Sequence, residues 1–111
     1  MISFLDGPAA GITLQLRSAP DLLRVVIHGV EFDALDQPKD VPRAEEQIVV
    51  YRRLGLATTY HLCARGKERH RSGWYSQAEY VLHDRQPDDA IARDTEAWQA
   101  WALSEQLPPQ P

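Results

Sequence analysis

The sequence predicts a mostly β domain of the α+β class that ends in one α-helix. Two observations lead to this prediction. From residue 2 to residue 83, short apolar segments alternate with turns that contain glycine or proline, as is typical of β-strands. After Pro87 the chain becomes rich in alanine, with apolar residues at helical spacing. We expect a small SH3-like barrel, or a curled antiparallel sheet, with the helix covering one opening or edge.

The first third of the chain supplies four predicted strands. Residues 2–5 are apolar and end at an Asp-Gly-Pro turn at 6–8. Apolar and polar residues alternate over 12–16, which predicts a half-buried strand. The β-branched segment 22–28 predicts a more buried strand, and residues 31–35 a return strand paired to it.

The middle of the chain predicts a long loop and further strands. Residues 36–46 hold two prolines and six charges, so they are expected to form the longest loop. Residues 48–53 alternate as a strand that is followed by a turn at 54–55. Segments 58–64 and 73–83 predict a long hairpin whose charged tip stands in water.

The C-terminal segment predicts one helix from about residue 87 to residue 106. Pro87 suits the first helical turn, and the two acids after it lie at the positive end of the helix dipole. An apolar stripe is formed by Ile91, Thr95, Trp98 and Ala102, with Trp101 beside it. We expect one domain over residues 1–107 and a proline-rich tail over 108–111.

Composition limits the classes of function. The 111 residues carry a net charge of −4, which gives no overall attraction to nucleic acid or to an anionic membrane. Cys63 is the single cysteine, so neither an internal disulfide nor a zinc-binding thiolate cluster is expected. The single cysteine fits a reducing, cytoplasmic setting. We expect no signal peptide, because the N-terminus lacks a basic start and an apolar run, and no membrane helix, because no segment approaches the ~20 apolar residues that one needs.

Charge is unevenly distributed along the chain. Residues 43–83 carry seven bases and four acids, whereas both flanking segments are acidic. This asymmetry indicates either charge complementarity within the fold or an electrostatic binding site. It also suggests that the acidic helix and the basic hairpin dock on each other.

The tip of the predicted hairpin is one candidate binding surface. Its basic residues, with an aromatic residue close behind, are Arg65, Lys67, Arg69, Arg71 and Trp74. Proteins that bind single-stranded nucleic acid use basic groups for phosphate and aromatic rings for base stacking. The alternative is a solubilising edge, because Glu68 dilutes the charge.

The helix offers the other candidate surface. Trp98 and Trp101 are three residues apart, so they lie on adjoining parts of one face. Tryptophan is enriched at the hot spots of protein interfaces, which makes both residues candidates for protein binding. Core packing against the sheet is the alternative, and an intermediate arrangement would place Trp98 inside and Trp101 at the rim.

No group of residues predicts catalysis. His61 and Cys63 would project from one face of a strand, but a lone strand cysteine is usually a buried hydrophobe. Asp33 and Asp36 fit a solvated loop better than an acid–base pair. No pair of histidines has helical metal-site spacing. We therefore expect neither an enzyme nor a metal or cofactor site.

Five segments together carry a resemblance that spans most of the chain. They are residues 2–11, 22–26, 32–37, 51–52 and 86–101. In these segments the chain resembles small proteins encoded by phages and prophages of actinobacteria. That family has no assigned activity, so the resemblance transfers no site residue. It implies an accessory protein made in the cytoplasm of a bacterial host cell.

Three functions are open at this point. The first is a non-enzymatic interaction module that binds a host or phage protein. The second is a nucleic-acid-binding small β-barrel that uses the basic hairpin tip. The third is a minor structural component of the virion. The sequence determines neither the partner nor the oligomeric state.

Overall fold

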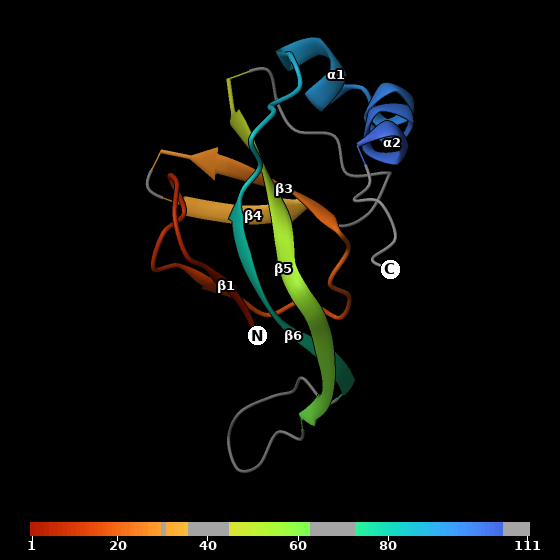
Figure 1. Cartoon of the computed structure of the whole chain (residues 1–111). Coiled ribbons are helices and arrows are strands. Elements are labelled where there is room, and N and C mark those ends of the chain that lie inside the picture. The colour runs from red at the N-terminus through yellow and green to blue at the C-terminus, as the bar shows by residue number, and fades with distance from the viewer. Residues whose placement is uncertain (30, 36–44, 63–72, 106–111) are drawn as a thin grey trace.

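The computed structural model describes residues 1–29, 31–35, 45–62 and 73–105. Six strands form one sheet, and two helices follow it (Figure 1). The elements are β1 (Ile2–Phe4), β2 (Thr13–Leu14), β3 (Leu22–His28), β4 (Glu31–Leu35), β5 (Gln47–Leu62), β6 (Gly73–Leu82), α1 (Asp89–Arg93) and α2 (Thr95–Ser104).

The sheet has the strand order β2-β1-β6-β5-β3-β4 and curls into a nearly closed barrel. Neighbouring strands are antiparallel, except that β1 lies parallel to β6. Through this parallel pair, the first strand of the chain lies beside the last. The predicted mostly β fold, a small barrel with a C-terminal helix, is confirmed.

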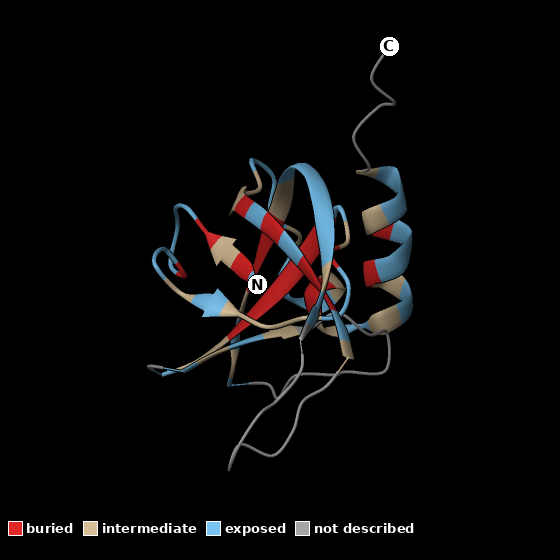
Figure 2. Cartoon of the chain, turned by 90° about the horizontal axis from the view of Figure 1, so that it is seen from below, coloured by how far each residue is buried: buried red, intermediate tan, exposed pale blue. Residues whose placement is uncertain are grey.

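The core fills the concave side of the sheet, where buried segments gather (Figure 2). Aromatic rings stand at its centre: Phe4 meets Tyr51 edge to face, with 4.7 Å between ring centroids. The other buried members are Ile2, Ala9, Ala19, Leu23, Val25, Val49, Ala78 and Tyr80. They come from β1, β3, β5 and β6 and from the turns between strands, so one core holds the barrel together.

Strand β3 is buried on both of its faces. Leu23 and Val25 point into the core, whereas Leu22 and Arg24 face the helices. Every residue from Leu22 to Val26 is therefore buried. Burial on both faces explains why apolar residues lie on both sides of Arg24 in this strand and do not alternate with polar ones. The hairpin of β3 and β4 across Gly29 is confirmed, with the predicted bounds.

Strand β5 runs unbroken from Gln47 to Leu62, so the predicted turn at residues 54–55 is wrong. The β5–β6 pairing shifts register between Leu54 and Thr58, and Gly55 takes a φ of 75° there. These residues form a bulge because both halves of β5 pair with the same strand, β6. The result is a long ribbon of two strands that extends past the rest of the sheet (Figure 1).

The single predicted helix over residues 87–106 is two helices. Asp94 has an extended backbone, with φ −88° and ψ 120°, which ends α1. Its carboxylate accepts a hydrogen bond from the Ala97 amide and so caps the start of α2. Asp88 caps α1 by accepting a hydrogen bond from the Ile91 amide, so Pro87 lies before the helix and not in its first turn as predicted. A residue with a capping side chain thus interrupts an otherwise helical sequence.

The remaining sequence predictions have mixed outcomes. The strand expected over residues 12–16 is reduced to Thr13–Leu14, although its apolar residues do pack on the core. Most of the predicted 36–46 loop, the hairpin tip and the 108–111 tail lie outside the described residues.

Two buried tyrosines tie turns to the sheet through their hydroxyl groups. The Tyr51 hydroxyl donates to the Asp6 carbonyl at 2.9 Å and accepts from the Ala9 amide at 2.8 Å. Gly7 has a φ of 70°, and a Cβ there would lie 2.7 Å from the Tyr51 hydroxyl oxygen. The Tyr80 hydroxyl donates to the Pro20 carbonyl at 2.5 Å. Burial, the largest cause in both cases, raises the pKa of both phenols.

These raised pKa values predict a loss of stability in alkali. In the unfolded chain the phenols ionise near their ordinary pKa of about 10, whereas burial moves the ionisation of Tyr51 and Tyr80 in the fold to higher pH. Stability is therefore fully present below about pH 10 and falls above it, by up to about 1.4 kcal/mol per pH unit for each tyrosine. Denaturant unfolding from pH 8 to 11 measures this slope. Tyr80→Phe should make the slope shallower, and an unchanged slope would contradict the assignment.

Candidate functional site

The most exposed aromatic side chain in the described part of the chain stands on the β5–β6 ribbon. Trp74 is 63% exposed and pairs directly across the ribbon with His61. Their ring centroids are 5.0 Å apart, with an angle of 57° between the planes. The contact restrains the indole while leaving much of its surface in water. Trp74 therefore offers a pre-positioned ring for stacking.

The two residues that follow Trp74 in β6 attach the ribbon to the segment around Arg17. Tyr75 is buried, and the guanidinium carbon of Arg17 lies 5.8 Å from its ring centroid. Ser76 holds the Arg17 segment by two bonds: its amide donates to the Leu16 carbonyl at 2.9 Å, and its hydroxyl donates to the Arg17 carbonyl at 3.0 Å. The exposed cation of Arg17 thus lies close to the strand that carries Trp74.

Arg17 also lies beside the first residue of β6. A Cβ at Gly73 would be 3.5 Å from Arg17 Nη2, an ordinary van der Waals distance, so the guanidinium lies against this end of β6. Arg17 is not indicated by the sequence, because no local spacing links it to Trp74. Only the strand pairings of β1 with β2 and of β1 with β6 bring residues 16–17 to this part of the ribbon.

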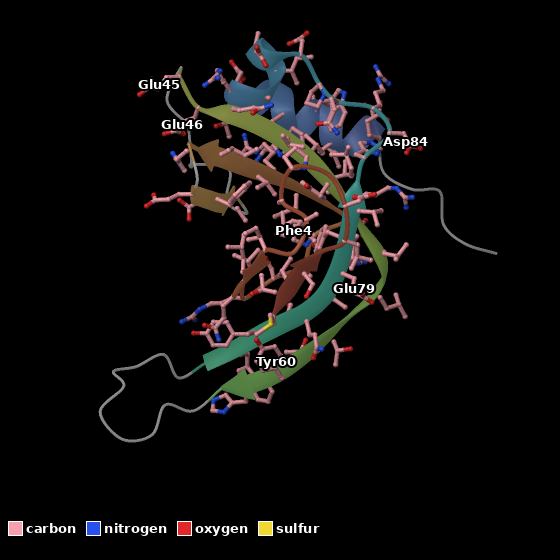
Figure 3. The ribbon with its side chains drawn as sticks, turned by 90° about the vertical axis from the view of Figure 1, so that its left-hand side faces the viewer. Phe4, Glu45, Glu46, Tyr60, Glu79 and Asp84 are labelled. Carbon is pink, nitrogen blue, oxygen red and sulfur yellow. The ribbon has the colours of Figure 1, made fainter. Side chains whose placement is uncertain are left out.

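Charge is unevenly distributed along the chain. The connection between β5 and β6 carries four bases and one acid, whereas residues 84–105 carry six acids and two bases. Figure 1 shows the helices at one end and the outer ends of β5 and β6 at the other. In Figure 3, Glu45, Glu46 and Asp84 lie toward the helical end, away from Tyr60. The basic residues of the hairpin tip lie outside the described residues, so the docking of the acidic helix on the basic hairpin stays a prediction.

The four basic candidates, Arg65, Lys67, Arg69 and Arg71, lie outside the described residues. They occur in the ten-residue connection between Leu62 and Gly73, the last residue of β5 and the first of β6. The chain therefore joins them directly to the strand ends that carry His61 and Trp74.

Trp98 and Trp101, the candidates for protein binding, are buried. Each is 8% exposed, and their rings stack with centroids 5.1 Å apart. They pack with Leu22 and Val50 on the convex side of the sheet. The expected difference between an inner Trp98 and a rim Trp101 is not found, because the sheet covers both rings equally.

Arg24 joins β3 to both helices. Its side chain is buried, and Nη1 donates to the Ala92 carbonyl of α1 at 3.1 Å. Its guanidinium carbon lies 5.0 Å from the ring centroid of Trp98 in α2. A cation between a helix carbonyl and a π face interacts favourably with both.

The aromatic stack continues from Trp101 to the end of β6. The His83 ring meets Trp101 edge to face, with centroids 5.7 Å apart. Within the described residues, both ring nitrogens of His83 are buried without a hydrogen bond, and Nε2 lies 3.8 Å from Glu105 Oε2. Glu105 also pairs with Arg85, which holds the end of α2 against the sheet.

Two further pairs considered in the sequence fall partly outside the described residues. Cys63 and Asp36 lie there, so the structure does not place the pairs of His61 with Cys63 and of Asp33 with Asp36. Asp33 instead lies 3.4 Å from His28 Nε2, and Glu46 lies 3.2 Å from His28 Nδ1. In the described ranges, no three histidine, cysteine or acidic residues gather as a metal site. None of the helices described there is long and apolar enough to cross a membrane.

Comparisons with known proteins add no relative. No protein-family model matches the chain, and neither the curated proteins nor the solved structures gave a match.

The geometry of Arg24 predicts a structural cost when it is truncated. Arg24→Ala leaves a cavity beneath Trp98 and removes the donor to the Ala92 carbonyl, so the free energy of unfolding should fall by about 3 kcal/mol. Arg24→Met should recover part of this loss because it restores packing but not the hydrogen bond. Denaturant unfolding followed by tryptophan emission measures both variants. An Arg24→Ala protein within about 0.5 kcal/mol of wild type would contradict this role.

Proposed function

We propose that this chain is a non-enzymatic binding module that holds single-stranded nucleic acid on its β5–β6 hairpin. The observation that carries the proposal is the exposed ring of Trp74, which contacts His61. Trp74 also follows the basic connection between β5 and β6 by two residues in the chain. Stacking on an aromatic ring contributes about 1–3 kcal/mol per base. It needs bases that are free of a duplex, which is why a single strand is the favoured ligand.

Arg17 supplies a described cation for this interaction. Its guanidinium lies over Tyr75 and beside Gly73, on the face of β6 opposite to Trp74, so a single strand reaches it by passing around the edge of the ribbon. Arg65, Lys67, Arg69 and Arg71 add positive charge to the same part of the chain. Phosphate contacts and ring stacking together are the usual means of binding a single strand without sequence preference.

The negative net charge does not oppose this assignment. Six of the sixteen acids lie over residues 84–105, in the helical region at the far end from the ribbon (Figure 1). Exposed charges separated by more than about 8 Å are largely screened at physiological ionic strength. A strand at the hairpin therefore responds chiefly to the local excess of positive charge.

A protein partner is the second candidate, and the bulge of β5 favours it. Leu54 and Leu56 are 46% and 90% exposed there, which gives the ribbon an apolar surface. Binding through Trp98 and Trp101 would require α2 to leave the sheet, because both rings are buried. A host or phage partner, phage origin and a place in the virion stay predictions from the sequence.

Fluorescence anisotropy of a labelled oligonucleotide of about 16 nucleotides tests the proposal. Wild-type protein should bind at low salt and weaken steeply as salt rises. Trp74→Ala should weaken binding at least about 5-fold without changing the salt slope, because it removes stacking and no charge. Arg17→Ala should reduce the slope by about 0.7, the value for one phosphate contact on a single strand.

Arg85→Ala is the matched control for Arg17→Ala. Arg85 is an exposed arginine at the helical end, so its removal changes the net charge equally but should leave binding unchanged. Absence of binding by wild-type protein at low salt would reject the proposal. Equal losses in Arg17→Ala and Arg85→Ala would reject the assigned surface.

A further inference from the structure

The helices cover only part of the convex side of the sheet. Trp98 and Trp101 pack there over Leu22 and Val50. The next two rows of side chains on this side come from β5, β6 and β1, away from that helix contact. They are Arg52, Val81 and Leu5 in one row, and Leu54, Glu79 and Ser3 in the other. We call these six residues the open face.

The alternation of side chains along the strands turns the open face away from the core. Phe4 points into the core, so the residues on either side of it in the chain point outward, and the same alternation holds in β5 and β6. In Figure 3, Phe4 lies within the curve of the sheet and Glu79 on the outer side of β6. Leu5 and Leu54 are exposed on the open face, and Leu56 is exposed beside it in the bulge. Three of the six exposed large apolar side chains in the described residues therefore gather here, as at a protein interaction surface.

Two opposite charges lie at opposite corners of the open face. Arg52 pairs across the ribbon with Val81, and Leu54 pairs with Glu79, so the two charged residues are diagonal neighbours. Among the described residues, neither of them forms an ion pair. The open face is thus largely apolar, has no net charge, and carries one base and one acid that another molecule can pair with.

We propose that a second copy of this chain docks on the open face through a two-fold axis that runs close to the diagonal from Leu54 to Val81. This axis places Arg52 of each copy opposite Glu79 of the other, so the contact contains two equivalent ion pairs. Between them, Leu54 meets Leu54 of the second copy. The inference goes beyond nucleic-acid binding and assigns the apolar surface at the bulge to self-association.

Other two-fold axes through the open face fit its charges less well. An axis along the other diagonal would bring Arg52 onto Arg52 and Glu79 onto Glu79. An axis parallel or perpendicular to the strands would place each charge against an apolar side chain, which costs solvation without a compensating pair. The favoured axis makes the strands of the two copies cross at a steep angle, as in the orthogonal packing of two sheets. Because this contact uses the same face of both copies, assembly ends at a dimer.

The dimer leaves the proposed nucleic-acid surface accessible. Trp74 and the core residue Tyr80 are six residues apart in β6, so Trp74 projects from the face of that strand opposite to the open face. The open face is small, which sets its interface at or below the low end of about 1,200 Å². We therefore expect a reversible dimer with a Kd of about 1 μM or weaker.

Sedimentation equilibrium over protein concentrations from about 1 μM to about 1 mM tests the proposal. The mass of the wild-type protein should rise from that of a monomer toward twice this value and no further. Leu54→Lys should weaken the dimer at least about 10-fold, because it places two lysines against each other at the centre of the contact. Leu103→Lys is the matched control: Leu103 is an exposed leucine of α2 outside the open face, so this variant should dimerise as wild type does.

Charge reversal tests the two-fold pairing itself. Arg52→Glu sets two acids against each other in both ion pairs, and Glu79→Arg sets two bases, so each variant alone should dimerise at least about 10-fold more weakly. An equal mixture of the two should recover the affinity of wild type, because the mixed dimer has an acid opposite a base at both contacts. Circular dichroism confirms that each variant is folded before it is used.

Three results would overturn the proposal: a wild type that stays monomeric or grows beyond a dimer, unchanged dimerisation of Leu54→Lys, or a mixture of the charge variants that associates no better than either alone. Leu54→Lys leaves Trp74 in place, so its oligonucleotide binding tests the nucleic-acid proposal separately.

Discussion

The pairing of β5 with β6 is the constraint on which the rest of the structure depends. Over Gln47–Arg52, β5 also pairs with β3 and so builds the wall of the barrel. Beyond the bulge at Gly55 its described strand partner is β6, and the two strands continue as a ribbon away from the core. One continuous strand thus joins a rigid barrel to the surface that we assign to binding. If residues 54–55 formed a turn in place of the bulge, β5 would end there and the ribbon would not form.

The three tryptophans divide into two roles because of where this pairing places them. Trp74 lies on the outer ribbon, where it is 63% exposed. Trp98 and Trp101 cover the convex side of the sheet, where Arg24 links β3 to α1 and α2. Because Trp98 and Trp101 are buried, they contribute to the stability of the domain. Trp74 is exposed and is therefore the tryptophan available for binding. Along the chain, the connection between β5 and β6 is basic and the segment with the helices is acidic.

Sequence patterns predict the local elements well and their long-range relations poorly. The β-branched segment at Leu22–His28 and its return strand are predicted with their bounds, because burial and turn chemistry are local. The bulge at Gly55 reads as a turn, since a glycine that accepts positive φ serves either purpose. Trp74 is visible as a candidate, but Arg17 is not, because the parallel β1–β6 pair that brings it there leaves no periodic signal. Likewise, the acid at Asp94 reads as one more helix residue until its cap is seen.

The central claim is that the hairpin tryptophan binds ligand while the helical pair supports the fold. Nuclear magnetic resonance of the three indole N–H groups, assigned with Trp74→Phe, tests it without disturbing the core. During titration with a single-stranded oligonucleotide, the Trp74 signal should shift progressively while the signals of Trp98 and Trp101 stay in place. Shifts of Trp98 or Trp101 with an unmoved Trp74 would contradict the account.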